Sequence, residues 1–368
     1  MVKRTHLIIL ASFLLMACHN NVSKDDAPCS QLTDYRIIAE YPCGQIGEIQ
    51  DAMVYHNHLI VNTLGSASGK YFLLIDLESG NIVNSWGNKG RGPGEFINVG
   101  RQISIRDSTL FFSDNGAKKL VSLNMDEMLR ERTGVMSSNE YPYTRDFRPA
   151  KFLAMKDVVI CLGAIDKLRF GMLDRYQNRI IGHNNLYMPH SEDVDGIYVG
   201  SVYQSLMQSN PRDEFFVISL LASDFFEIFK LEGQQAQRVF VSGDATMPKM
   251  LFKPKMGTNY TIDYENSIAG NVGLAASVDR IFFLYSDASY AKYSEKGESD
   301  HIKCYSWTGE HLEDYTLPFP VSRIVSTENG LICFEEKEDK IVLCEFSFPA
   351  CPHLVATPIM KSSGTSPK

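Results

Sequence analysis

The stretch GNKGRGPGEF (residues 87–96) decides how the chain is interpreted, because it holds four glycines and one proline in ten positions. Glycine allows backbone conformations with positive φ, and proline cannot donate a hydrogen bond to a strand ladder, so these residues predict a loop. Short runs rich in apolar and β-branched residues lie on both sides, at 81–86 and 97–105. The stretch therefore connects two β-strands.

A glycine-rich loop can also bind phosphate, since converging backbone N–H groups hold an anion. That arrangement requires a Lys-Ser or Lys-Thr pair and a helix that opens directly behind the loop. Neither follows Phe96, where the sequence continues as a strand. We interpret the loop as a structural connection.

Beyond residue 33, short apolar runs recur at a spacing that is typical of the repeated sheets of a β-propeller. They are HLIVNT (58–63), TLFFSD (109–114), VVICLG (158–163), EFFVIS (214–219), RIFFLY (280–285) and GLICFE (330–335). Each run follows one short strand and precedes another, and a fourth strand usually follows a turn with Gly or Asn. Four strands in each of six units predict an all-β, six-bladed β-propeller with four-stranded antiparallel blades. Helical character is confined to a short turn at 126–132.

The last unit is one strand short, whereas residues 34–41 (DYRIIAEY) alternate like a strand and belong to no blade. We expect this N-terminal strand to close the ring, with residues 35–41 antiparallel to 341–348. Otherwise the apolar edge of KIVLCEF (340–346) could pair with another chain. The predicted propeller spans 34–350 and is followed by a polar tail, 351–368.

The loop that ends GRGPGEF (90–96), together with this repeat, resembles the inter-blade connection of NHL-type propellers. It is more similar still to the TolB-like six-bladed propeller lipoproteins of Gram-negative bacteria. Six-bladed relatives include lactonases and lyases that hold a metal or a His pair at the centre of the ring.

The N-terminus is typical of an export signal. Lys3 and Arg4 precede an apolar run too short to span a bilayer, and LMAC (15–18) resembles a lipobox. That resemblance implies removal of residues 1–17 and lipidation of Cys18, which would anchor the protein in the outer membrane. An ordinary secretory signal that contains a cysteine is the alternative.

Residues 18–33 are polar and predict a flexible tether. Within them, KDD (24–26) resembles the signal that sends some lipoproteins to the cell surface, which slightly favours that face over the periplasmic one. The alternative is a tether with chance charges.

The net charge of −8 and the lack of a dense Lys/Arg run argue against a nucleic-acid partner. Of eight cysteines, seven remain after Cys18, and no Cys-x-x-Cys pair suggests zinc. Ring closure would bring Cys29 near Cys351, so we expect a disulfide between them if their Cα atoms lie within about 7 Å. Cys333 and Cys344, on neighbouring strands, are the competing pair.

The most metal-like segment, HNNLYMPHSEDVDG (183–196), has two His and three acids. It lacks the downstream Glu of an EF-hand loop and a helical His spacing, so we interpret it as a solvated loop. We predict neither a metal nor another cofactor.

The residues at the start of the innermost strands distinguish a propeller enzyme from a binding module. The corresponding positions of the six units are Asp51, Gln102, Lys151, Met207, Gly273 and Arg323. They include one acid and no His, and no Gly-x-Ser-x-Gly elbow occurs, which departs from the propeller enzymes. We expect a binding or scaffold module for a protein, peptide or glycan rather than an enzyme. The alternative is a lactonase-like hydrolase or lyase with its site in the channel.

Basic residues cluster beside the expected inner-strand entries. Arg101, Arg148, Lys151 and Arg323 come from units two, three and six. They predict an anion or partner site at one mouth of the channel. Alternatively they point outward, or pair with Asp51 and Glu48 as a structural network.

Overall fold

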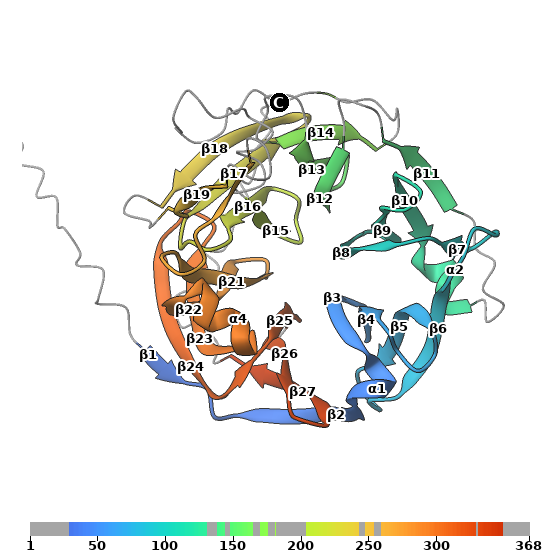
Figure 1. The fold of residues 1–368 in the computed structure, drawn as a ribbon, viewed down its shortest axis with the longest axis horizontal. Helices are drawn as coiled ribbons and strands as arrows, with labels where there is room; N and C mark the ends of the chain where they lie inside the picture. The colour runs from blue at the N-terminus through green and yellow to red at the C-terminus, as the bar shows by residue number, and fades with distance from the viewer. Residues whose placement is uncertain are drawn as a thin grey trace, which may run out of the picture.

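The apolar runs form the middle strands of six sheets arranged radially around one axis (Figure 1). In this computed structural model, the structure describes residues 29–130, 138–143, 148–164, 170–175, 181, 204–242, 247–253, 259–328 and 330–348. The predicted all-β six-bladed propeller is confirmed.

The blades follow one another along the chain, and each begins at the axis. Blade 1 contains β3 (Glu48–Tyr55), β4 (His58–Leu64), β5 (Lys70–Asp76), β6 (Ile82–Lys89) and β7 (Glu95–Phe96). Blade 2 contains β8 (Val99–Arg106), β9 (Thr109–Asp114), β10 (Lys119–Asn124) and β11 (Ser138–Pro142). The described part of blade 3 contains β12 (Arg148–Ala154), β13 (Val158–Ala164) and β14 (Phe170–Asp174).

The remaining blades complete the ring. Blade 4 contains β15 (Ser205–Ser209), β16 (Phe215–Leu220), β17 (Phe226–Glu232) and β18 (Gln235–Val241). Blade 5 contains β21 (Ile268–Ala276), β22 (Arg280–Ser289), β23 (Ser299–Ser306) and β24 (His311–Val321). Blade 6 contains β25 (Arg323–Ser326), β26 (Gly330–Glu336), β27 (Lys340–Ser347) and β2 (Tyr35–Pro42).

Aromatic side chains fill the layers between neighbouring blades. Phe72 of blade 1 meets Phe112 of blade 2 with ring centroids 5.0 Å apart. Phe226 of blade 4 lies 4.8 Å from Phe283 of blade 5. Because each middle strand is covered on both faces, its residues are buried almost without alternation, as in β4 and β5.

The N-terminal strand closes the ring as expected. β2 pairs antiparallel with β27, so that Tyr35 lies opposite Phe346 and Tyr41 lies opposite Ile341. Upstream, β1 (Cys29–Gln31) falls within the segment that the sequence suggests is a tether, and it pairs in parallel with β24. The N-terminal segment therefore joins blades 5 and 6, and the edge of β27 is covered.

The loop at 87–96 connects blades 1 and 2, as predicted. The Oε2 atom of Glu95 accepts a hydrogen bond from the backbone N–H of Gly92 at 2.8 Å. A Cβ atom on Gly90 would come within 1.9 Å of that oxygen. A side chain at position 90 would therefore displace the Glu95 carboxylate from its hydrogen bond to Gly92.

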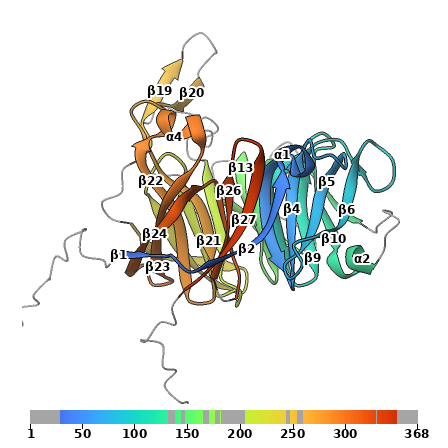
Figure 2. The same cartoon turned by 90° about the horizontal axis from the view of Figure 1, so that it is seen from below.

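Three helices and one hairpin decorate the described ring. α1 (Cys43–Ile46) precedes β3, and α2 (Met125–Arg130) falls in the region where the sequence predicts a helical turn. The strand pattern predicts neither α4 (Tyr290–Lys296) nor the hairpin of β19 (Met250–Lys253) and β20 (Asn259–Ile262). Figure 2 shows α1, α4 and this hairpin on one face of the ring, where the inner strands begin. No helix in the described part is both long and apolar enough to span a membrane.

The cysteines of the described residues are free thiols. Cys333 lies directly opposite Cys344, and both are buried. Cys29 is exposed on β1, whereas Cys18 and Cys351 lie outside the described residues. The Cys29–Cys351 disulfide therefore stays a prediction. The segment 183–196 also lies outside the described residues.

Candidate binding site at the mouth of the channel

A cavity of about 1570 Å³ runs along the axis of the ring and is lined by the innermost strands of all six blades. The six inner-strand positions that the sequence singled out all line it: Asp51, Gln102, Lys151, Met207, Gly273 and Arg323. They come from β3, β8, β12, β15, β21 and β25.

Two of these polar side chains hold adjacent inner strands together. The Oδ2 atom of Asp51 accepts a hydrogen bond from the backbone N–H of Ile103 at 2.9 Å. One blade further on, the Oε1 atom of Gln102 accepts one from the backbone N–H of Phe152 at 3.1 Å. Inner strands of different blades form no continuous ladder, so such side-chain bonds satisfy their free N–H groups. Asp51 and Gln102 thus have structural roles.

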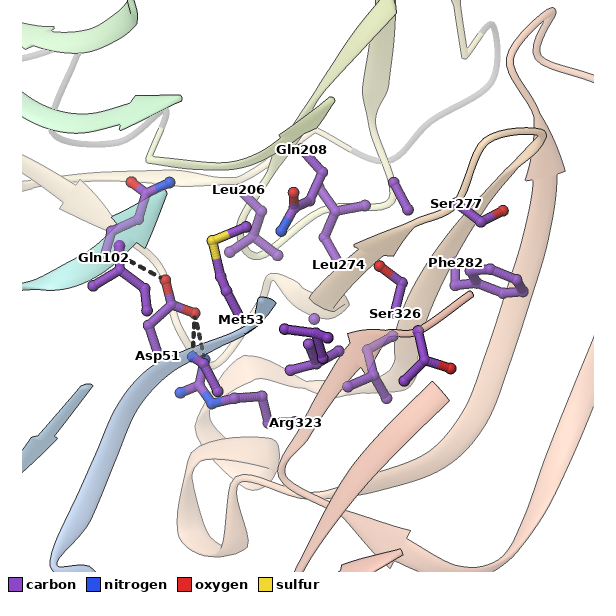
Figure 3. A pocket seen from close by; sticks show the side chains of 18 of the residues that line it. Asp51, Met53, Gln102, Leu206, Gln208, Leu274, Ser277, Phe282, Arg323 and Ser326 are labelled. Atoms are coloured by element: carbon purple, nitrogen blue, oxygen red, sulfur yellow. Dashed lines mark hydrogen bonds and ion pairs between the residues drawn. The ribbon is translucent and has the colours of Figure 1, made fainter. Parts of the chain in front are cut away.

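Arg323 completes a clasp between blades 6 and 1. Its Nη1 atom lies 3.5 Å from Oδ1 of Asp51, and its Nη2 atom donates to the backbone oxygen of Ile49 at 3.3 Å (Figure 3). Burial raises the pKa of Asp51, and Arg323 together with two backbone N–H groups opposes that shift. Arg323 therefore pairs with a carboxylate as part of a structural network, which is the alternative to a role in anion binding.

Lys151 and Arg101 behave differently, although they line the same cavity. Lys151 is half-buried and Arg101 is exposed, and neither forms a hydrogen bond or ion pair with any residue that the structure describes. Burial lowers the pKa of Lys151, which Arg323 and Arg101 lower further and Asp51 raises. After burial, Asp51 has the largest influence on this pKa, and the two arginines oppose it. Arg148 begins β12, but its side chain lies outside the described residues.

Two tyrosines of α4 lie at the same end of the channel as Arg101 and Lys151 (Figure 2). Tyr290 and Tyr293 line the cavity, and the backbone N–H of Tyr290 donates to Ser267 O at 2.8 Å, directly before β21. Burial raises the pKa of Tyr293 to about 12, so its hydroxyl is neutral at physiological pH. The helix carries recognisable caps, since Ser289 accepts from Lys292 N and Gly297 adopts a left-handed conformation. These caps are the signal by which the tyrosines could have been found.

Further along the axis the wall becomes largely apolar. Met53, Leu206 and Leu274 line the cavity beside Asp51 and Arg323, together with the uncharged polar side chains of Gln208 and Ser326 (Figure 3).

The far ends of the inner strands form a different kind of mouth. Arg106, the last residue of β8, forms an ion pair with Asp213 and donates from both Nη atoms to the Pro211 oxygen at 3.1 Å. Nearby, Arg175 donates to the backbone oxygens of Met155 and Lys156 at 2.9 and 2.8 Å. Arg106 thus joins blade 2 to blade 4, and Arg175 binds the β12–β13 turn of its own blade.

Within the described residues, no cluster of three or more His, Cys, Asp or Glu could hold a metal ion. We call this end of the channel, with Arg101, Lys151 and Arg323, the cationic mouth. It is the candidate site because Arg101 and Lys151 lack a hydrogen bond or ion pair to the described residues.

The sequence and the structure were compared with those of known proteins. The profile of the "TolB-like 6-blade propeller-like" family matches residues 52–329. A member of the DUF4221 family from Bacteroides vulgatus superposes with a TM-score of 0.53 at 12% identity, covering 85% of this chain and 98% of the other. A putative exported protein from Bacteroides fragilis gives a TM-score of 0.54 at 10% identity, covering 88% and 99%. No curated protein matches the sequence. The chain therefore belongs to the TolB-like six-bladed propeller family.

Proposed function

We propose that this protein is a lipid-anchored propeller of the outer membrane that binds an anionic group of a protein, peptide or glycan partner. The partner docks at the mouth formed by Arg101, Lys151 and α4. The observation that carries this proposal is the presence of two cationic side chains in the channel without a partner among the described residues.

An unpartnered, partly buried ammonium group lowers the stability of the folded state, because burial removes water and no counter-charge replaces it. A ligand anion would offset that cost. Arg101 can add paired hydrogen bonds to a carboxylate or phosphate. Asp51 cannot neutralise Lys151 fully, since it already accepts two backbone N–H groups and contacts Arg323.

The same contacts separate a binding site from the hydrolase or lyase alternative. Asp51 is an acid at the centre of the mouth, and its oxygens are engaged in holding β8 and β25. A general base must reach a substrate proton, and a carboxylate committed to backbone amides is poorly placed to do so. We therefore favour binding over catalysis.

Binding is tested with two double variants, each of which removes two positive charges: one at the proposed site and one, as a control, on the inter-blade loop. Arg101→Ala with Lys151→Ala should weaken binding of citrate or inorganic phosphate about tenfold or more, measured by calorimetric titration. The matched control is Lys89→Ala with Arg91→Ala, which removes the same charge from exposed residues of the inter-blade loop. Equal affinities for the two double variants would overturn the site.

Lipid anchoring is proposed from LMAC at 15–18, and one structural neighbour is itself described as a putative exported protein. In a Gram-negative host, Cys18→Ala should abolish acyl labelling and membrane fractionation. Partitioning of the variant into detergent like the wild type would contradict the anchor. Digestion by an external protease on intact cells tests whether the protein faces the surface, as Lys24-Asp25-Asp26 suggests, or the periplasm.

A further inference from the structure

The charged mouth of the channel is followed by an apolar layer on the same strands. Met53 lies two residues beyond Asp51 on β3, and Leu153 lies two residues beyond Lys151 on β12. Residues i and i+2 of a strand project to the same side, so the apolar layer lies deeper along the side that carries the charges. Leu206 of β15 and Leu274 of β21 extend it to two further blades.

Polar groups interrupt this apolar wall at two places. Gln208 of β15 and Ser326 of β25 line the cavity, and their side chains form no hydrogen bond with the described residues. An amide and a hydroxyl can donate to or accept from a ligand backbone. Apolar walls with a few convergent polar groups are typical of ligand sites, and this layer of the channel has both. The whole cavity, about 1570 Å³, leaves room for more than a simple anion.

We propose that the channel captures the free carboxyl terminus of a peptide or protein that ends in apolar residues. This inference rests on the proposed function and names its ligand. Arg101 and Lys151 bind the terminal carboxylate, and Met53, Leu206 and Leu274 contact the last side chains. Gln208 and Ser326 bind the adjacent backbone amides. Capture of a terminal carboxylate by fixed donors is a recurring mode of peptide recognition.

A fatty acid would use the charged and apolar layers but would leave the amide and hydroxyl unused. The peptide is therefore favoured, because it engages all three kinds of group, and the fatty acid becomes an outcome of the test.

The test compares four probes by calorimetric titration on the full mature chain: Gly-Gly-Leu-Leu as free acid, its C-terminal amide, Gly-Gly-Ser-Ser as free acid, and octanoate. The leucine acid should bind about tenfold or more tightly than each of the other three. Octanoate binding as tightly as the leucine acid would replace the peptide by a fatty acid. Equal binding of the acid and its amide would remove the carboxylate contact.

Variants assign the contacts to residues. Arg101→Ala should weaken the binding of Gly-Gly-Leu-Leu as free acid about tenfold and leave the binding of its amide unchanged. Met53→Gln, which keeps a side chain of similar shape, should weaken the binding of Gly-Gly-Leu-Leu and leave the binding of Gly-Gly-Ser-Ser unchanged. Leu64→Gln, at an exposed leucine on β4 outside the cavity, is the control. If citrate or phosphate binds at the mouth but no peptide does, this inference fails and the proposed function stands. If no anion binds either, both fail.

Discussion

Two arginines at opposite ends of β8 show how the two mouths of the channel differ. Arg106 ends the strand with its guanidinium engaged by Asp213 and by the Pro211 oxygen, both from the β15–β16 connection. Arg101, five residues earlier, lines the cavity without a hydrogen bond or ion pair to the described residues. The same residue type on one strand thus joins blades at one mouth and remains available at the other.

The difference comes from which arginines contact a carboxylate. The Asp213 side chain is 7% exposed, and its burial raises its pKa while Arg106 lowers it. A carboxylate this buried needs its cation. At the other mouth, Asp51 contacts Arg323 and two backbone N–H groups. The described residues around Lys151 supply no second acid. One mouth is therefore structural, and the other is cationic and open to a ligand.

The largest expected effect breaks the structural mouth. Arg106→Ala removes the ion pair and two hydrogen bonds and leaves Asp213 buried without its cation. We expect the free energy of unfolding in urea to fall by about 3–5 kcal/mol. Arg101→Ala on the same strand should change it by less than about 0.5 kcal/mol. Adding Asp213→Asn to Arg106→Ala should restore part of the loss, because the uncompensated charge is gone. Similar losses for Arg101→Ala and Arg106→Ala would refute the comparison.

A smaller effect is expected from Arg323, which belongs to the cationic mouth but is paired. Arg323→Ala loses the contact with Asp51 at 3.5 Å and one hydrogen bond to Ile49 O. Both side chains are about a quarter to a third exposed, so solvent screens the pair. We expect a loss of about 1–2 kcal/mol in urea unfolding. Faster hydrogen exchange should be confined to the seam of blades 6 and 1. A stability equal to that of the wild type would place Arg323 with Arg101 as a ligand-binding residue.

The sequence predicts the ring well because its signals are local. Runs such as HLIVNT at 58–63 and turns such as Glu78-Ser79-Gly80 mark each strand separately. Closure by an antiparallel pairing of β2 with β27 is also predictable, because one strand is missing at one end and spare at the other. Six repeats then converge on one axis, which brings Arg101, Lys151 and Arg323 to one cavity.

The partners of these residues are not predictable in the same way. Asp51 accepts a hydrogen bond from Ile103, which is fifty-two residues away, and nothing near either residue signals that bond. Arg106 meets Asp213 across an even longer separation. Whether an arginine is free or paired is therefore a tertiary property. The strand pattern also conceals α4, although Ser289 and Gly297 cap it.

The smallest expected effect sharpens the comparison through the pH dependence of stability. The pKa of Lys151 in the folded state is lowered from its ordinary value of 10.5, so the unfolded chain binds more protons at this position. The free energy of unfolding contributed by Lys151 therefore rises with pH, between the lowered folded pKa and 10.5. Lys151→Met removes a half-buried charge that lacks a partner among the described residues, so at pH 7 the variant should be as stable as the wild type or more stable.

The gap between Lys151→Met and the wild type should close as the pH approaches 10, because the wild-type ammonium then loses its proton. Urea unfolding of both chains from pH 7 to 10 measures this difference and cancels the titration of the other lysines. Lys151→Arg keeps its charge throughout, so its stability should fall progressively behind that of the wild type over the same range. A gap that widens with pH would mean that Lys151 is stabilised as a cation by a protein carboxylate. The two mouths would then be alike, and the cationic mouth would have no unpaired lysine for a ligand to neutralise.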